Sequence, residues 1–146
     1  MISHKVRSIT VCTSASFYRQ SWKIKERLEK QGFRVSMPHT AKVMRRTGNY
    51  QVSHYKVWYK DKNLFKRKAL LMARHFREIE KGDAILVLNL NKKGSRGYIG
   101  GNVLMEMALA FYLKKLIYIW RTVQESQPFY EEILGMEPIF LNEKVE

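Results

Sequence analysis

Short β-branched apolar runs alternate along the chain with longer amphipathic stretches. Segment 83–89 (DAILVLN) has a continuously apolar interior, which is typical of a central strand in a parallel sheet. Segments 16–30 and 102–113 are predicted to be helices, and 54–81 one or two helices with uncertain ends. With 83–89 included, the apolar runs predict five strands, at 6–12, 33–37, 83–89, 116–120 and 138–141.

Strands that alternate with helices predict βαβ units and a mainly parallel sheet. At 146 residues the chain has the length of one domain, so we expect a single α/β domain over 1–146. Five such strands favour a flavodoxin-like three-layer sandwich with strand order 2-1-3-4-5. In that order ligands bind where the chain reverses between strands one and three. The loops 13–17 and 90–102 are therefore expected to meet at a ligand site.

Composition and termini narrow the class of protein. The longest apolar run, 103–113, is interrupted by Glu106 and is too short to span a bilayer, so we expect no membrane segment. The N-terminal residues lack the pattern of a secretory signal, and the single cysteine, Cys12, cannot form an internal disulfide. These features predict a cytoplasmic protein.

The charge is strongly unbalanced, with a formal net charge of +14. Segment 39–81, predicted to be a basic helical segment, holds 12 Lys and Arg residues and 3 acidic ones. Such a field attracts phosphorylated small molecules and nucleic acids alike. A solvated helical face is the alternative explanation.

Both loops of the predicted site carry suitable groups. The first loop, 13–17, offers the hydroxyls of Thr13, Ser14 and Ser16. They lie beside the free N–H groups of the helix that follows, and such N–H groups can hold an anion or a sugar oxygen. Ser16 can equally be a plain N-cap. The second loop matches no standard phosphate-binding pattern, but its glycines let main-chain N–H groups approach a ligand closely; they are Gly94, Gly97, Gly100 and Gly101.

Glu106 stands out in the helix 102–113, because its helical neighbours are uncharged. A carboxylate on such a helix must point into the protein, where burial is costly unless the group is paired or hydrogen-bonded. The pattern alone leaves two roles open for Glu106, a structural anchor for nearby N–H groups or a chemical group.

Four stretches together carry a family resemblance: ITVCTSASFY, HFREIEKGDAILVLN, GYIGGNVLMEMALA and KKLIYIW. The combination resembles the nucleoside 2-deoxyribosyltransferase-like superfamily, which includes nucleotide N-glycosidases. The likeness covers roughly 6–38 and 71–141 and leaves 39–70 without a counterpart. The family's nucleophile is a glutamate in a Glu-x-Gly/Ala-x-Ala pattern, which Glu106 to Ala110 match. The resemblance implies a homo-oligomer, and we expect no cofactor.

The resemblance implies cleavage of an N-glycosidic bond, or deoxyribosyl transfer, on a nucleoside or nucleoside 5′-monophosphate. Glu106 would attack the anomeric carbon, and a second base or water would release the sugar. The substrate would be held by Thr13, Ser14, Ser16, Phe17, Gly97, Tyr98, Gly100, Gly101 and Asn102. A 5′-phosphate could be neutralised by Arg19, Lys92, Lys93 or Arg96, and a base could stack on Tyr18, Trp22, Tyr98 or Phe129, although Trp22 is expected in the core.

The chain departs from the family at two positions. His75 and Gly100 stand where classical members have aspartates, which weakens the part of the site that handles the base. His75 is either a replacement proton donor or a structural residue. Asn102 is expected to cap its helix, with sugar binding as the alternative. Asp83 is expected to be a turn residue.

Cys12 is expected to be a small buried apolar residue, because nothing in the sequence marks a cluster of cysteine, histidine and carboxylate. The histidines lack ligand spacing, and we expect no metal.

Two other function classes stay open. One is a nucleotide-binding or signalling module that keeps the pocket without turnover, and the absent aspartates favour it. The other is a nucleic-acid-binding protein that uses the basic and aromatic segment 42–68.

Overall fold

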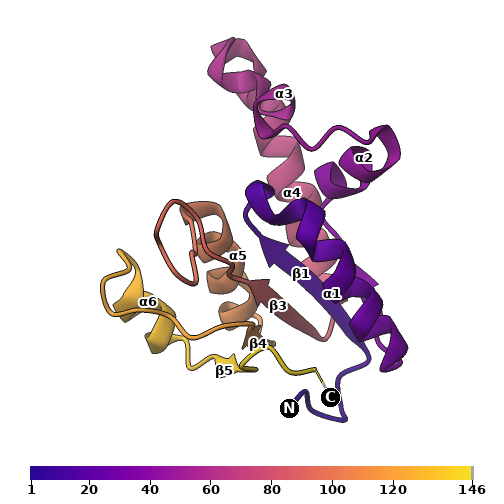
Figure 1. Cartoon of the computed structure of the whole chain (residues 1–146), viewed down its shortest axis with the longest axis vertical. Helices are drawn as coiled ribbons and strands as arrows, with labels where there is room; N and C mark the ends of the chain where they lie inside the picture. The colour runs from indigo at the N-terminus through magenta and orange to yellow at the C-terminus, as the bar shows by residue number, and fades with distance from the viewer. Residues whose placement is uncertain (146) are drawn as a thin grey trace.

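The five strands form one parallel sheet (Figure 1). The computed structural model describes residues 1–145. Each neighbouring pair of strands is parallel, and the order β2-β1-β3-β4-β5 confirms the predicted flavodoxin-like topology. The strands are β1 (Ser8–Thr13), β2 (Arg34–Ser36), β3 (Ala84–Leu88), β4 (Leu116–Ile119) and β5 (Ile139–Phe140).

Helices cover both faces of the sheet. Helix α1 (Tyr18–Lys30) packs on one face together with apolar residues near both chain ends. The other face is covered by α4 (Phe65–Lys81), α5 (Gly101–Tyr112) and α6 (Tyr130–Gly135). The central strand β3 is buried on both sides, because its residues alternate between the two cores. This explains its continuously apolar sequence.

The basic segment is more broken than the sequence suggests. It contains α2 (His39–Thr47), α3 (Val52–Tyr55) and two 3₁₀ turns, η2 (Val57–Tyr59) and η3 (Lys62–Leu64), before α4 begins. Helix α2 ends at Gly48, whose φ of 75° suits a residue without a Cβ. In Figure 1 this segment rises beyond the carboxyl end of β1. Within residues 1–145, every helix is too short or too polar to cross a membrane.

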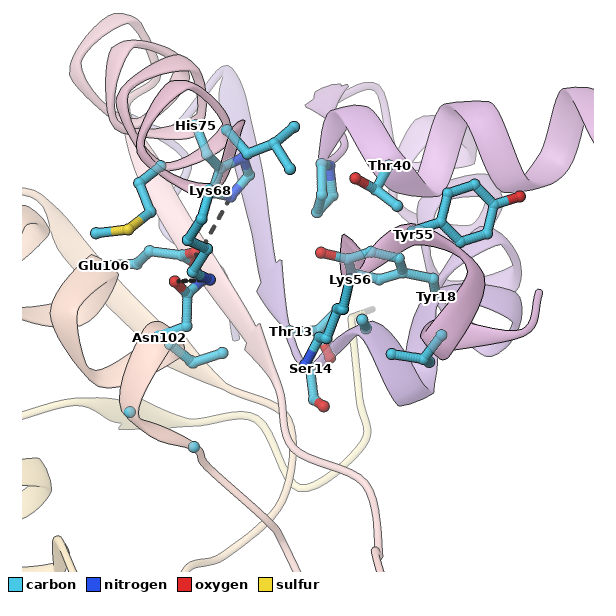
Figure 2. Close-up of a pocket in the computed structure, with 18 of the residues that line it drawn as sticks. Thr13, Ser14, Tyr18, Thr40, Tyr55, Lys56, Lys68, His75, Asn102 and Glu106 are labelled. Carbon is cyan, nitrogen blue, oxygen red and sulfur yellow. Dashed lines mark hydrogen bonds and ion pairs between the residues drawn. The ribbon is translucent and has the colours of Figure 1, made fainter. Parts of the chain in front are cut away.

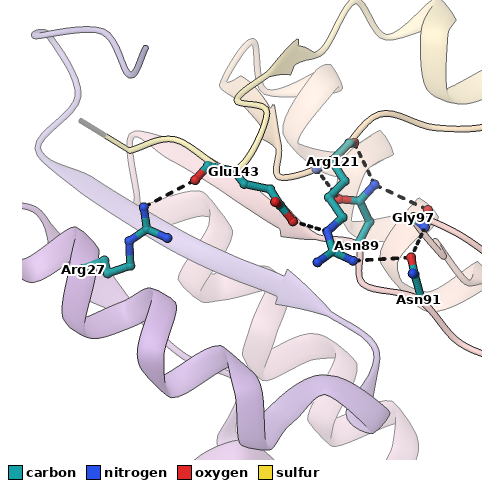
Figure 3. A network of polar contacts seen from close by, with 6 residues as sticks. All are labelled: Arg27, Asn89, Asn91, Gly97, Arg121 and Glu143. Carbon is teal, nitrogen blue, oxygen red and sulfur yellow. Dashed lines mark hydrogen bonds and ion pairs between the residues drawn. The ribbon is translucent and has the colours of Figure 1, made fainter.

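A polar network fixes the glycine loop to the end of the sheet (Figure 3). Fully buried Asn89 follows β3, accepts a hydrogen bond from the Arg121 backbone N–H at 2.8 Å and donates to the Arg121 carbonyl at 2.9 Å. Asn91 accepts from the Gly97 N–H at 3.2 Å, and Arg121 pairs with Glu143. The loop that precedes α5 is thereby held in place by Arg121, which follows β4, and by the C-terminal segment.

Asp83 lies at the opposite, amino edge of the sheet. Its carboxylate accepts hydrogen bonds from the backbone N–H groups of Arg7 at 2.8 Å and Ser8 at 3.0 Å. These bonds lower the pKa of Asp83. The residue joins the start of β3 to β1, as expected of a turn residue, and it is far from the ligand end of the strands.

Candidate functional site

A pocket of about 370 Å³ lies at the carboxyl end of β1, at the predicted point of chain reversal. Its walls come from the loop after β1, from α4 and from the start of α5 (Figure 2). The remaining wall comes from the part of the basic segment that precedes α4, which the sequence did not place there. It includes His39, Thr40, Tyr55, Lys56 and Trp58. The segment without a family counterpart is therefore part of the site.

Glu106 lines this pocket with only 5% of the residue exposed. Its Oε1 accepts a hydrogen bond from Asn102 Nδ2 at 2.8 Å. Its Oε2 is buried, and among residues 1–145 no donor forms a hydrogen bond of good geometry with it. Burial raises the pKa of Glu106 from its ordinary 4.5 to about 8, against the opposing effects of the Cys12 thiol and Lys68. The carboxyl group thus belongs to the pocket lining, with Oε1 held by Asn102 and Oε2 enclosed beside His75.

Asn102 connects Glu106 to a lysine. It lies one helical turn before Glu106, and its Oδ1 accepts a hydrogen bond from Lys68 Nζ at 2.8 Å while its Nδ2 donates to Glu106. The capping role expected of Asn102 is wrong, because the N-cap of α5 is Gly100, which offers no side chain for a cap. The amide of Asn102 instead fixes the carboxylate and positions an ammonium group beside it.

His75 reaches the same carboxylate from α4. Its residue is 7% exposed, and its Nε2 lies 3.7 Å from Glu106 Oε2 and 3.7 Å from Cys12 Sγ. Burial lowers the pKa of His75 to about 4, although a hydrogen bond with the Val11 backbone opposes the shift. The ring is therefore neutral near pH 7. The structure brings the two residues predicted to be catalytic together.

Cys12 is fully buried, as expected, but it also completes a buried cluster that the sequence did not indicate. The side-chain donor atoms of Cys12, His75 and Glu106 all lie within 4.8 Å of one another. Burial, with Glu106 nearby, raises the pKa of the Cys12 thiol well above its ordinary value, so it stays protonated. Thiolate, imidazole and carboxylate are also the groups that bind Zn²⁺, and these three could hold one.

The loop after β1 contributes only part of what was expected. Thr13 and Ser14 line the pocket, and the Thr13 hydroxyl donates to the Leu88 carbonyl at 2.6 Å. Ser14, not Ser16, is the N-cap of the 3₁₀ turn η1 (Ala15–Phe17), because its hydroxyl accepts from the Ser16 N–H at 3.4 Å. Ser16 is exposed and lines a separate depression next to the pocket, together with Arg19. The capping alternative for Ser16 is therefore wrong.

The glycine loop presents Tyr98, Gly100 and Gly101 to the pocket. Two other predicted residues support it from behind. Phe17 is buried and packs edge-on against the Tyr98 ring, with centroids 6.4 Å apart. Gly97 has a φ of 63°, and a Cβ there would lie 2.5 Å from the Thr122 carbonyl oxygen, so the position requires glycine.

The other aromatic side chains lie in different parts of the fold. Tyr18 lines the pocket, and burial raises the pKa of its phenol. Phe129 packs on the core face that carries α4, α5 and α6. The expectation that Trp22 lies in the core is wrong, because the residue is only partly buried and its ring lies under Arg45, whose guanidinium carbon is 4.3 Å from the ring centroid. Trp58 lines the pocket and was not anticipated from the sequence.

The positive charge of the pocket comes from lysines that the sequence only partly indicated. Of the four cations proposed for a phosphate, only Lys92 lines the pocket, where it joins Lys56 and Lys68. Glu106 is the one acidic residue among the described residues that line it. Lys66 and Arg67 of the basic segment are exposed. Binding of nucleic acid by this segment remains a prediction, and so does assembly into a homo-oligomer.

Comparison with known proteins adds no relative. No protein-family model matches the chain, and the search of curated proteins gives no significant match. The resemblance to the nucleoside 2-deoxyribosyltransferase-like superfamily therefore stays a prediction, and function has to be argued from the pocket.

Proposed function

We propose that this protein cleaves the N-glycosidic bond of a nucleoside or nucleoside 5′-monophosphate, or transfers its glycosyl group, with Glu106 as the nucleophile. One observation carries the proposal. Glu106 Oε2 is buried, lacks a hydrogen-bonding partner of good geometry within residues 1–145, and belongs to a residue that lines a 370 Å³ pocket. A buried carboxyl oxygen without such a bond costs stability, and groups of this kind are concentrated at functional sites.

The reaction would proceed in two displacements. A carboxylate oxygen of Glu106 forms a bond to the anomeric carbon while the C–N bond breaks, and the base leaves with the bonding electrons and takes up a proton. Water or a second base then attacks the same carbon and releases Glu106, so the configuration of the sugar is retained. The hydrogen bond from Asn102 to Oε1 orients the carboxylate during both displacements.

His75 is assigned a positioning role beside Glu106 in this proposal. Its pKa, lowered to about 4, leaves the ring almost wholly unprotonated near pH 7, which makes it a poor proton donor to the leaving base. The ring nevertheless lies 3.7 Å from Oε2 and closes the buried side of the site. The proton for the base would then come from water or from another group at the mouth of the pocket.

Free-base release tests the proposal. Ribo- and deoxyribonucleosides and their 5′-monophosphates are incubated with wild type, with Glu106→Gln, and with Glu80→Gln, a control at an exposed glutamate on α4. We expect release by wild type and Glu80→Gln, with a loss of at least about a thousandfold for Glu106→Gln, as for other nucleophiles. Release that survives in Glu106→Gln would refute the role of Glu106.

A second candidate is a nucleotide-binding module without turnover. The observation that favours it is the pKa of Glu106, raised by burial to about 8, because a protonated carboxyl group is not a nucleophile. Lys68 acts in the opposite direction and favours the carboxylate. Nucleotide binding by wild type with no base release at any pH, with or without an acceptor base, would select this candidate.

A further inference from the structure

Three lysines from three separate segments meet at the pocket. Lys56 lies between α3 and η2, Lys68 is in the second turn of α4, and Lys92 belongs to the loop after β3. Figure 2 shows Lys56 and Lys68 entering the pocket from opposite walls. Their charges affect one another, because Lys68 and Lys92 add to the burial that lowers the pKa of Lys56. Residues far apart in the sequence thus form one cationic cluster.

Among the described residues that line the pocket, Glu106 is the one carboxyl group that opposes the charge of these three lysines, and it acts on Lys68. No ion pair found among residues 1–145 involves Lys56, Lys68 or Lys92. Lys68 donates to the neutral amide of Asn102 at 2.8 Å, and Lys92 Nζ lies 4.9 Å from the Tyr98 ring centroid. Partly buried ammonium groups that repel one another reduce stability, and an anionic ligand would relieve this repulsion.

Backbone donors add to the same site. The twelve-residue helix α5 begins at the pocket, which both Gly100 and Gly101 line. Its first N–H groups have no partners within the helix, and its N-cap supplies no side chain. The positive end of the helix dipole and close backbone approach at glycine favour a phosphoryl group there. Ser14 offers a hydroxyl across the pocket.

We propose that the lysine cluster binds the phosphoryl group of a nucleoside 5′-phosphate, so that the substrate of the site is a nucleotide and not a free nucleoside. The inference rests on the proposed function for its glycosidic part. Asn102 alone separates Lys68 from Glu106, since it is hydrogen-bonded to both. Of the three lysines, Lys56 comes from segment 39–64, which also lines the pocket.

Binding is measured separately from turnover. Isothermal titration calorimetry compares ribose 5-phosphate and 2-deoxyribose 5-phosphate with the unphosphorylated sugars, none of which has a glycosidic base to lose. The proteins are wild type, Lys56→Gln, Lys92→Gln and Lys60→Gln. The last variant is the matched control, because Lys60 is exposed in the same segment and its loss changes the net charge equally. Thermal unfolding verifies that each variant is folded.

The expected result is at least about tenfold tighter binding of the phosphorylated sugars to wild type, with a loss of about tenfold or more in Lys56→Gln and Lys92→Gln. Lys60→Gln should bind as wild type does. Equal binding of ribose and ribose 5-phosphate would overturn the inference. An equal loss in Lys60→Gln would also overturn it, because the effect would then come from overall charge.

Kinetics separates this inference from the proposed function. Equal base release from nucleosides and 5′-monophosphates would overturn the phosphate inference and leave the glycosidic function intact. Lysine-dependent binding of sugar phosphates with no base release from any nucleotide would overturn the glycosidic function and leave the phosphate site standing.

Discussion

Replacement of Glu106 by glutamine is expected to remove a pH dependence of folding stability. Burial raises the pKa of this carboxyl group from 4.5 to about 8, so between these values the folded state binds a proton that the unfolded chain releases. The stabilisation is complete below the unfolded pKa and is lost as the pH rises through the folded pKa. From about pH 6.5 to 8.5 the loss amounts to about 2 kcal/mol.

Titration of His75 changes folding stability in the opposite direction and over a lower pH range. Its pKa is lowered from 6.5 to about 4, so its contribution to stability grows between these values and is nearly complete above them. The range from about pH 6.5 to 8.5 therefore reports mainly on Glu106. Glutamine has nearly the same shape as glutamate and does not titrate, and the variant keeps His75, so the residual effect of His75 is common to both proteins.

Urea unfolding followed by fluorescence of the three tryptophans measures this difference. With an m-value of about 2 kcal/mol per molar, the wild-type midpoint should fall by about 1 M between about pH 6.5 and 8.5, and that of Glu106→Gln should change much less. Parallel shifts in the two proteins would refute the buried, high-pKa carboxyl group. They would also contradict a proton held on Glu106 in the folded protein near neutral pH.

Three further outcomes are expected. Asn102→Ala removes the hydrogen bond that orients the carboxylate and should lower kcat for base release by about tenfold or more, with little change in the melting temperature. Gly97→Ala should destabilise the protein by about 1–3 kcal/mol in thermal unfolding, because its Cβ would clash with the Thr122 carbonyl. Gly94→Ala is the control: it has open space around it and should cost about 1 kcal/mol from its positive φ alone. Dialysis against a chelator should leave base release unchanged, because the proposed reaction uses Glu106 directly. Activity that is lost to the chelator and restored by Zn²⁺ would show instead that the buried cluster of Cys12, His75 and Glu106 is a metal site.

The candidate site was predictable where it depends on local pattern. Glu106 is the charged residue in an otherwise apolar helix, and that contrast alone predicted its burial, which the structure confirms. The capping role expected of Asn102, and the capping alternative for Ser16, failed because capping depends on where a helix begins. The 3₁₀ turn η1 starts one residue after Ser14, and α5 starts at Gly101, so different residues occupy the cap positions.

The sequence by itself determined the fold, because alternating apolar runs leave few ways to bury five strands and their helices, and parallel βαβ connections restrict the order. Only the tertiary structure decided the chemistry of the pocket. Cys12 and His75 are 63 positions apart, and Lys68 and Asn102 are 34 apart. No local spacing encodes such contacts, because they arise when packed helices bring side chains to one edge of the sheet. The basic segment is the clearest case. Its charge was readable in the sequence, but which of its lysines line the pocket depended on how the segment is placed beyond the carboxyl end of β1.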